Sequence, residues 1–430
     1  MFFRNLSKIK SSCLIFYYSK ENKHSLRYLL ASLEKNKFLL KNTDFLFAYN
    51  ENDLKDLLKR THFYKKRIIC FSFFSTQIED VLKIIGYLKK EKNLIKIIGG
   101  AFSSFCYERL LKMGFDYAFI GEAEDTFPLF LERIIKEEDI NDLEGIAYKK
   151  ERLFLKRRTK NVDINKYLPV SRYFKKMGHI EITRGCTFKC KFCSTPALFK
   201  SMRHRNLEVI FEAVKIMKEF NFCDIRFLSP NAFSYFCLKK TPNLEMIEKL
   251  LKGTRKIIKN EGKIFFGSFP SEVRPDFINK EIIKLLKKFV DNDNIIIGAQ
   301  SGSIRLLKLL NRGHTKEEVI EAVRITKEEF KVYVDIILGF PQENYEDRKE
   351  TIAFIKELMK LGAKIHLHYF LPLAGTPLFL EKPTPLEKEI RKQIERWEGE
   401  GKIFGQWRKQ LELSLKLSSL NEELFSYLER

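Results

Sequence analysis

Short hydrophobic runs alternate with helical spacing along the first third of the chain. β-Branched and aromatic residues gather in these runs, and the segments between them place apolar residues three or four positions apart. This alternation is typical of parallel strands connected by helices. It predicts an α/β, doubly wound (Rossmann-like) parallel sheet over residues 1–142. The expected strands are residues 13–18, 44–49, 67–73, 94–98 and 117–120.

A second alternating region follows a connection at residues 143–176, which contains an expected β-hairpin at 145–157. Its βα units predict a partial TIM-type (β/α)6 barrel over residues 177–378, with the active site on the loops after the strands. Residues 379–430 are rich in Glu and Lys and predict a helical C-terminal extension, interrupted near 399–405. The barrel strands are expected at residues 179–183, 224–228, 263–266, 294–298, 333–339 and 365–370.

Small and polar residues follow the last three strands of the first domain. Ligands of doubly wound sheets bind outside the carboxyl ends of the strands, and a Gly-Gly pair lets the backbone approach a bulky ligand. Turns without a ligand would also account for the glycines. The candidate ligand-binding residues are Ser72, Thr76, Gly99, Gly100, Ser103, Gly121, Glu122 and Glu124.

The composition of the 430 residues excludes several classes of protein. With 44% hydrophobic and 31% charged residues, coiled coils, collagens and disordered chains are ruled out. No apolar stretch approaches the roughly 18 to 20 residues that cross a bilayer. Residues 1–8 have some basic character, but the apolar run that follows is shorter than a signal-peptide core. We therefore expect a cytoplasmic protein with no membrane span.

The formal net charge of +23 would suit a polyanionic partner such as RNA. The lysines, however, are scattered through all the expected helices instead of forming one basic arm. Lysine-rich surfaces are also common in proteins of thermophiles. An RNA partner stays possible on charge alone but is not favoured.

Three cysteines, Cys186, Cys190 and Cys193, lie within eight positions just after the first barrel strand. Three thiolates can converge on one metal centre, and sulfur ligands favour iron-sulfur clusters, zinc or cuprous copper. Zinc would need a fourth ligand, and the spacing to His204 fits no usual zinc pattern. Three ligands instead leave one coordination position open.

The spacing Cys-x3-Cys-x-aromatic-Cys, completed by Phe192, resembles the signature of radical S-adenosylmethionine (SAM) enzymes. The resemblance implies a 4Fe-4S cluster on the three cysteines and SAM bound through the open iron. It also implies reductive cleavage of SAM to a 5′-deoxyadenosyl radical, with an electron donor such as ferredoxin or flavodoxin. The protein would orient and shield this chemistry.

Other loops at the ends of the expected barrel strands also resemble SAM-contacting segments of this family. Two positions depart from the family pattern. Ser229-Pro230-Asn231 replaces a common Gly-Gly-Glu, and Gln300 stands where Glu is commoner, although an amide still forms hydrogen bonds. Arg312 and His314 belong to a similar segment, and a helix-end charge with a capping contact would explain them equally. The residues implied to bind SAM are Phe192, Ser229, Asn231, Ser271, Glu272, Arg274, Gln300 and Ser301.

A doubly wound domain placed before a radical SAM domain is similar to the cobalamin-binding domains of cobalamin-dependent radical SAM enzymes. Residues 224–235, 267–274 and 375–377 resemble one subfamily best known from archaea. The resemblance implies cobalamin as a further cofactor and a transferase that methylates, or rearranges, an unactivated carbon of an unknown substrate. The usual Asp-x-His-x-x-Gly loop is missing. His24 lies at about the right place to replace its histidine, but an exposed loop histidine is the commoner explanation.

His366 and His368 end the last expected barrel strand, and strand alternation places both on one face. If that face points into the barrel, both are candidate catalytic residues that contact substrate or relay protons. A structural role for both is equally consistent with the sequence.

Two other functions compete with this interpretation. A methylthiotransferase-like enzyme would modify RNA or protein with a second cluster, for which Cys13, Cys70 and Cys106 are available, but their contexts are those of buried hydrophobic residues. A non-catalytic RNA-binding iron-sulfur protein would explain the charge and predicts a steep salt dependence of RNA affinity. It would leave the open three-cysteine site unexplained.

Overall fold

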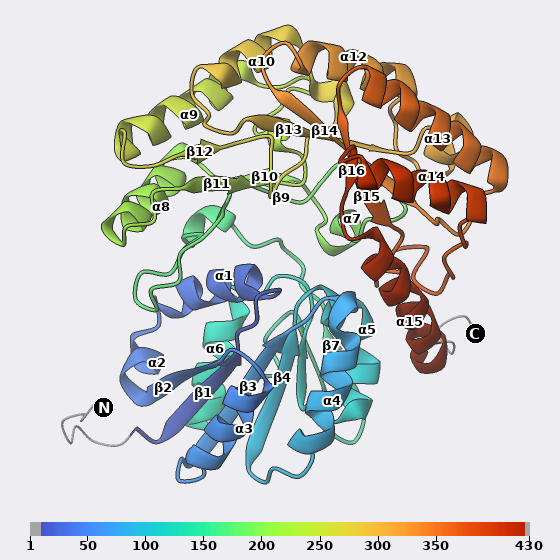
Figure 1. Ribbon diagram of the computed structural model, residues 1–430. Helices are drawn as coiled ribbons and strands as arrows, with labels where there is room; N and C mark the ends of the chain where they lie inside the picture. The colour runs from blue at the N-terminus through green and yellow to red at the C-terminus, as the bar shows by residue number, and fades with distance from the viewer. Residues whose placement is uncertain (1–9, 426–430) are drawn as a thin grey trace. The chain divides into compact units, whose positions relative to one another are not determined.

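The computed structural model describes residues 10–425 of the chain. The chain divides into two compact units, unit 1 (Met1–Lys176) and unit 2 (Met177–Arg430), which are described separately (Figure 1). Residues 1–8, from which we expected no signal peptide, lie outside the described part, as do the last five residues of the C-terminal extension. In residues 10–425, no helix combines the length and hydropathy needed to cross a membrane.

Unit 1 contains one seven-stranded sheet in the order β2-β1-β3-β4-β5-β6-β7. The first five strands are parallel, and the order reverses between β1 and β3, where doubly wound sheets bind ligands. All five predicted strands are confirmed. They are β1 (Ser12–Tyr17), β2 (Thr43–Ala48), β3 (Lys66–Ser72), β4 (Leu94–Gly99) and β5 (Tyr117–Phe119).

Helices cover both faces of this sheet (Figure 1). One face packs leucines and phenylalanines of α1, α2 and α6 into a core with alternate strand residues such as Leu14, Phe16 and Ile68. The other face is covered by α3, α4 and α5. The helices are α1 (Lys23–Leu33), α2 (Lys37–Asn42), α3 (Glu51–Arg60), α4 (Ile78–Leu88), α5 (Ala101–Met113) and α6 (Thr126–Lys136).

The predicted hairpin forms as β6 (Ile146–Lys149) and β7 (Leu153–Lys156). The sequence analysis placed it in a connection, whereas β6 pairs antiparallel with β5 and extends the sheet. The reason is that Ile146 and Tyr148 are buried in the same core as Phe119. Residues 143–176 therefore belong to unit 1.

Unit 2 is an open, barrel-like arrangement of parallel strands in two sheets, β12-β11-β8 and β13-β14-β15-β16. A parallel bridge between Val273 and Ile297 joins them. Each predicted barrel strand is present. The strands are β8 (Ile180–Glu181), β11 (Ile225–Leu228), β12 (Ile264–Phe265), β13 (Asn294–Gln300), β14 (Lys331–Leu338), β15 (Lys364–Tyr369) and β16 (Ile403–Phe404).

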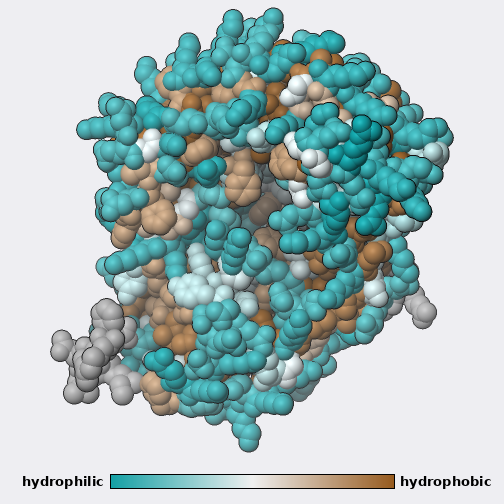
Figure 2. Space-filling view, in the orientation of Figure 1, coloured by the Kyte–Doolittle hydropathy of each residue, from teal (hydrophilic) through white to brown (hydrophobic). Residues whose placement is uncertain are grey.

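Helices surround the curved strands of unit 2, and their outward faces are mostly hydrophilic (Figures 1 and 2). This is the arrangement expected for a (β/α) fold whose strands form the core. Short helices α7 (Thr195–Leu198) and α11 (Ile304–Leu309) lie in loops after strands. The surrounding helices are α8 (Leu207–Glu219), α9 (Leu244–Ile258), α10 (Lys280–Lys287), α12 (Lys316–Thr326), α13 (Tyr345–Lys360) and α14 (Lys388–Gly399).

The sequence analysis missed β16 and two short antiparallel strands, β9 (Thr183–Arg184) and β10 (Arg203–His204). In the C-terminal extension, the expected helix interruption is a strand that adds to the sheet beside β15. Gly405 allows this close approach, because a Cβ atom there would lie 2.3 Å from the carbonyl oxygen of Leu367. Helix α15 (Trp407–Phe425) then follows.

Candidate functional site

The three cysteines of the expected cluster site lie in one loop of unit 2. Burial raises the pKa of Cys186 and of Cys193, and the neighbouring Cys190 raises both further. Metal binding releases thiol protons, so a metal cluster would remove the cost of burying these groups. Three adjacent sulfur donors fit the iron-sulfur cluster that the sequence implied.

The strand that leads into this loop is fixed by a buried ion-pair network. Arg184 and Arg205 both donate to the carboxylate of Glu181, at 2.8 Å and 3.0 Å. At Gly185 the φ angle is +82°, and a Cβ atom would lie 2.3 Å from the carbonyl oxygen of Ser201. The residue before the first cysteine therefore has to be glycine.

The loop is also held from the turn after β13. The backbone N–H of Lys191 donates to the carbonyl of Leu310 at 3.0 Å, and the amide of Asn311 donates to the carbonyl of Lys189 at 2.9 Å. Arg312 points its guanidinium at the Cys190 sulfur, 3.7 Å away. Arg312 follows the C-terminal end of α11, where its backbone N–H donates to the carbonyl of Leu307, and its guanidinium also reaches the cysteine loop.

Two polar side chains, those of Gln300 and Glu272, converge with this arginine at the bulge between Gly298 and Gln300. A Cβ atom on Gly298 would lie 2.8 Å from Arg312 Nη2, 2.9 Å from Gln300 Nε2 and 3.0 Å from Glu272 Cδ. The glycine makes room for them. Burial and the adjacent carboxylate of Asp335 raise the pKa of Glu272 above its usual range. His314 lies nearby with its Nε2 atom 3.1 Å from the carbonyl of Ala299.

Several buried polar atoms in this region lack a hydrogen-bond partner among residues 10–425. They include Nδ2 of Asn231, Nη1 of Arg274 and Oε1 of Gln300. A buried polar group without a partner costs about 1–3 kcal/mol. Two donors and one acceptor fit a ligand that carries a carboxylate and hydroxyl groups, as SAM does. The Arg274 guanidinium also stacks on Phe188 of the cysteine loop, at 3.6 Å.

The other residues predicted to bind SAM use their side chains within the protein. The hydroxyl of Ser229 donates to the carbonyl of Asn231, and that of Ser271 donates to the carbonyl of Phe227. Phe192 packs against Phe340 with ring centroids 5.5 Å apart. These contacts shape the loops, and direct contact between these three side chains and SAM stays a prediction.

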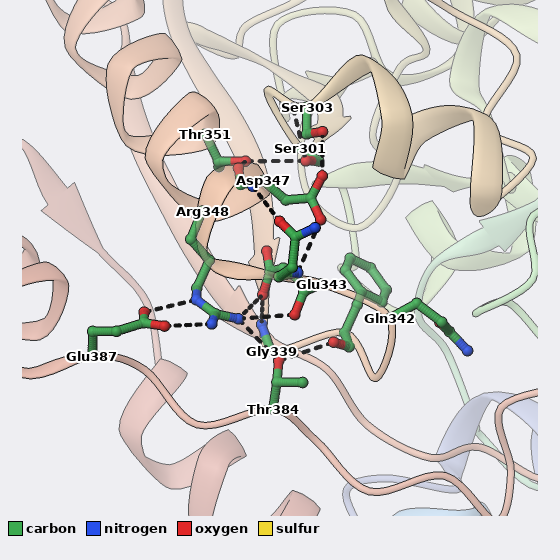
Figure 3. A network of polar contacts seen from close by, with 12 residues as sticks. Ser301, Ser303, Gly339, Gln342, Glu343, Asp347, Arg348, Thr351, Thr384 and Glu387 are labelled. Atoms are coloured by element: carbon green, nitrogen blue, oxygen red, sulfur yellow. Dashed lines mark hydrogen bonds and ion pairs between the residues drawn. The ribbon is translucent and has the colours of Figure 1, made fainter.

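Ser301 belongs to a network that ties the loops after β13 and β14 to α13 (Figure 3). Its hydroxyl lies 3.1 Å from that of Thr351. Glu343 accepts from the N–H of Gly339 at 2.7 Å, and burial raises the pKa of Glu343 to about 7. The sequence analysis did not single out Asp347 and Arg348 of this network. The signal for them was the capping box of α13, in which Asn344 and Asp347 satisfy each other's backbone N–H groups.

His366 and His368 lie with Asp335 on one face of β14 and β15. The neighbouring positions Val334, Ile336, Ile365 and Leu367 are fully buried on the opposite face. The two histidine side chains are 30% and 26% exposed, so the face that carries them is accessible. The structure thus brings both predicted histidines together beside a carboxylate that the sequence analysis had not selected.

In unit 1, candidate cobalamin-binding residues lie at the carboxyl edge of the sheet. The hydroxyl of Ser72 lies 2.8 Å from that of Ser25, and Gly99 ends β4. Gly100 could not carry a side chain, because a Cβ atom would lie 2.7 Å from Ser72 Oγ. At Gly121 the φ angle is +72° and nothing lies within 4 Å of a Cβ position. The open position at Gly121 fits a bulky cofactor, whereas Gly100 is needed for packing inside the protein.

The remaining candidates of unit 1 have different surroundings. The Ser103 hydroxyl is buried and donates to the carbonyl of Phe119 at 3.0 Å. Thr76 lies in a turn of 3₁₀ helix after β3. Glu122 and Glu124 are both buried, and Glu122 accepts from the N–H of Val162 at 3.2 Å. A role for these four residues in cofactor binding stays a prediction.

His24, the histidine closest to the expected cobalt-ligand position, contacts Arg27. Nη2 of the arginine lies 2.9 Å from Nδ1 of the imidazole. Because a guanidinium only donates, Nδ1 accepts this hydrogen bond and the ring of a neutral His24 carries its proton on Nε2. Neither ring nitrogen then offers a free lone pair, so this arrangement does not favour His24 as a metal ligand.

The three cysteines of unit 1 do not converge. Cys13 on β1 pairs with Arg67 on β3, so these two side chains share a face of the sheet. Cys70 lies three positions after Arg67 on β3, so its thiol points to the opposite face. Cys106 lies in α5. Burial raises the pKa of Cys13 to about 11 and that of Cys106 to about 12. These thiols are placed as buried apolar groups, not as ligands of one cluster.

Comparison with known proteins agrees with this division. The model of the radical SAM superfamily matches residues 180–355, and that of the B12 binding domain matches residues 18–131. A Methanocaldococcus jannaschii protein provisionally named a methylthiotransferase is 28% identical over 314 residues, 69% of this chain and 66% of that protein. The tRNA-2-methylthio-N(6)-dimethylallyladenosine synthase of Thermosipho melanesiensis is 27% identical over 384 residues, 84% of this chain and 81% of that enzyme.

Solved structures share the fold. The radical SAM methyltransferase TsrM from Kitasatospora setae, with cobalamin and a [4Fe-4S] cluster bound, superposes with a TM-score of 0.65. It covers 86% of this chain and 74% of its own, at 15% identity. The cobalamin-dependent radical enzyme OxsB, with aqua-cobalamin bound, gives 0.61 at 19% identity, over 81% of this chain and 52% of its own. The matching domains imply a 4Fe-4S cluster and SAM in unit 2 and cobalamin in unit 1.

Proposed function

We propose that this chain, a member of the radical SAM superfamily with a B12-binding domain, is a cobalamin-dependent methyltransferase that acts on an unactivated carbon. The observation that carries the proposal is the contrast between the two sets of cysteines. Cys186, Cys190 and Cys193 share one short loop of unit 2, whereas the thiols of unit 1 point apart and leave the sheet edge to small residues. This arrangement fits one cluster and one bulky cofactor.

The residues of unit 2 would divide the work of holding the cofactors. Cys186, Cys190 and Cys193 would hold the cluster, and Arg312 would place a positive charge beside it. The unpaired atoms of Asn231, Arg274 and Gln300 would hold SAM. When bound, the cluster and SAM supply hydrogen abstraction by a radical, and cobalamin supplies a transferable methyl group.

In unit 1, Gly121 would let the backbone approach cobalamin, and Ser72, whose hydroxyl donates to that of Ser25, could accept a hydrogen bond from the cofactor. A protein ligand to cobalt is not needed for this arrangement, in agreement with the hydrogen bond that Arg27 makes to His24. The accessible face of β15 would contact the substrate through His366 and His368. A soluble electron donor would supply the reducing equivalents.

The test is an anaerobic purification with cobalamin supplied, followed by iron and cobalt analysis and an optical spectrum. We expect four irons and one cobalt per chain, and the formation of 5′-deoxyadenosine and S-adenosylhomocysteine from SAM once a substrate is present. A Cys186→Ser, Cys190→Ser, Cys193→Ser variant is the control and should keep cobalt while losing iron. Four irons without cobalt would contradict methyl transfer through cobalamin.

A second candidate is methylthiolation of RNA or protein, which the named functions of the sequence relatives favour. That reaction would draw sulfur from a second cluster in unit 1. Its test is the same iron analysis, because a second 4Fe-4S cluster would raise the count to eight. The opposed orientations of Cys13 and Cys70 argue against this outcome.

A further inference from the structure

We propose that Asp335, His366 and His368 bind a divalent transition-metal ion, at a second metal site separate from the cysteine loop. One carboxylate oxygen and one nitrogen of each imidazole all lie within 4.8 Å of one another. Two histidines and one carboxylate are a donor set suited to Zn²⁺ or Fe²⁺. The inference does not depend on methyl transfer or on the cluster.

The spacing of the three donor atoms matches a shared ion. His366 Nδ1 lies 2.9 Å from Asp335 Oδ1 and 3.1 Å from His368 Nε2, and His368 Nε2 lies 3.7 Å from Asp335 Oδ1. Ligands about 2.0–2.1 Å from zinc are separated by about 2.9 Å at a right angle and about 3.3 Å at the tetrahedral angle. The observed triangle spans these values.

Without an ion, the protons of this triangle do not satisfy every contact. Gln410 Oε1 accepts from the N–H of Tyr369, so its Nε2 group donates to Nδ1 of His368, 3.3 Å away. The proton of a neutral His368 is then on Nε2 and points at His366 Nδ1. If His366 Nδ1 accepts the His368 proton, the lone pair of Nδ1 also faces the Asp335 oxygen, and two acceptors meet. If His366 Nδ1 instead carries a proton and donates to Asp335, that proton faces the proton on His368 Nε2. A cation that receives three lone pairs removes the conflict inside the triangle, and it moves the His368 proton to Nδ1, where that proton faces the amide of Gln410.

All three donors lie on strands. Asp335 and His366 are register partners on β14 and β15, and His368 follows on the same face of β15. The carboxyl of Glu272 hydrogen-bonds to Asp335 and the ring of Phe404 stacks on His366 at 4.7 Å, which fixes both side chains. Sites built on strands hold their geometry better than sites on loops.

The site also has the openness that a functional ion needs. Asp335 is largely buried, whereas the two histidines are partly exposed on the inner face of unit 2. Three protein ligands leave coordination positions for water or for a substrate oxygen or nitrogen, as in catalytic zinc sites. The ion would therefore bind substrates that carry such donors on the face of β15.

Gln410 gives the proposal a sharp test, because metal binding through Nε2 requires a proton on Nδ1 of His368. The amide presents its Nε2 group there, whereas a carboxylate in Gln410→Glu accepts from both Tyr369 and His368. Partners of this kind change metal affinity about 10- to 100-fold. We expect Gln410→Glu to bind the ion about 10-fold tighter and Gln410→Leu to bind it no better than the parent.

The experiment uses the full chain with Cys186→Ser, Cys190→Ser and Cys193→Ser, freed of metal, so that no thiolate of the cluster site competes. Titration with Co²⁺ should give one equivalent with d–d absorption and without thiolate charge transfer, displaced by one equivalent of Zn²⁺. His368→Ala and Asp335→Asn should abolish saturable binding, and His62→Ala, at an exposed histidine, should not. Circular dichroism checks folding.

The proposal is overturned if the folded parent binds no Co²⁺, or if His368→Ala binds it as tightly as the parent does. The wild-type chain with its cluster assembled is the second measurement, in case the serine variant fails to fold. There we expect one zinc per chain in addition to four irons, lost in His366→Ala while iron is kept. Zinc retained in His366→Ala would refute the site. If iron were also lost in that variant, the substitution would have disturbed the cluster.

Discussion

Gly100 lies where the chain after β4 approaches the chain after β3, and this close approach lets us predict how much Gly100→Ala destabilises unit 1. Its φ and ψ angles of +93° and −177° belong to a region that is nearly exclusive to glycine. A Cβ atom would lie 2.7 Å from Ser72 Oγ and 2.9 Å from both N and O of Phe73. The backbone atoms of Phe73 cannot retreat, because its N–H donates to Gly99 and its carbonyl accepts from Phe102.

The magnitude has two parts. The backbone conformation costs a non-glycine residue about 1–3 kcal/mol, and forcing a methyl group into a packed site costs about 1–3 kcal/mol more. Gly100→Ala should therefore lower the free energy of unfolding of unit 1 by roughly 2–6 kcal/mol. Two matched variants separate these contributions. Gly121→Ala has only the backbone cost, about 1–2 kcal/mol, because nothing lies near its Cβ position. Gly86→Ala, inside α4 with open space around it, should raise the free energy of unfolding by about 0.5–1 kcal/mol.

Hydrogen exchange of the β3 and β4 amides, followed by mass spectrometry, measures these differences within unit 1. Gly100→Ala should speed exchange about 30-fold or more, since each 1.4 kcal/mol is tenfold, and Gly86→Ala should slow it. An exchange rate in Gly100→Ala no faster than in Gly121→Ala would refute the steric argument, because both variants share the backbone cost.

Three other predictions concern the sites. Asn231→Leu and Gln300→Leu should each weaken SAM binding about 10-fold in equilibrium dialysis, at unchanged iron content, because each removes a buried hydrogen-bonding group; unchanged SAM affinity would contradict their assignment. Burial raises the pKa of Glu343 to about 7, so folding favours the protonated carboxyl. The stability that this carboxyl contributes is fully present below about pH 4.5 and should be lost as the pH rises through about 7. Thermal melts of Glu343→Gln over the same pH range should not show this loss. Cys13→Ala and Cys70→Ala should leave the iron count at four, and a fall from eight to four in either variant would establish a second cluster.

Much of the fold follows from local sequence, because buried parallel strands need runs of β-branched and aromatic residues. The five strands of unit 1 and the six barrel strands were predicted within a few residues. Strand β16 was missed because Ile403 and Phe404 are too few to form a pattern and lie between glycines. Its place is set by pairing with β15, which no local signal reveals.

The sequence predicts the part of the site whose residues are close together in the chain, as in the cysteine loop. It does not predict which side chains from distant strands come together. Asp335 is a single acidic residue inside an apolar run, and only the register of β14 with β15 brings it to His366. The hydroxyls of Ser103 and Ser271 matched the pattern of a ligand site, yet tertiary contacts give them backbone partners.

Strand β16 also bears on how the protein is made. Chains fold from the N-terminus as they are synthesised, and β16 and Gln410 emerge after β15 and α14. Until then, β15 is the open edge of its sheet, with unpaired N–H and C=O groups that can pair with another chain. A nascent or truncated polypeptide that ends before Ile403 should therefore self-associate through β15, and the pairing of β16 protects that edge.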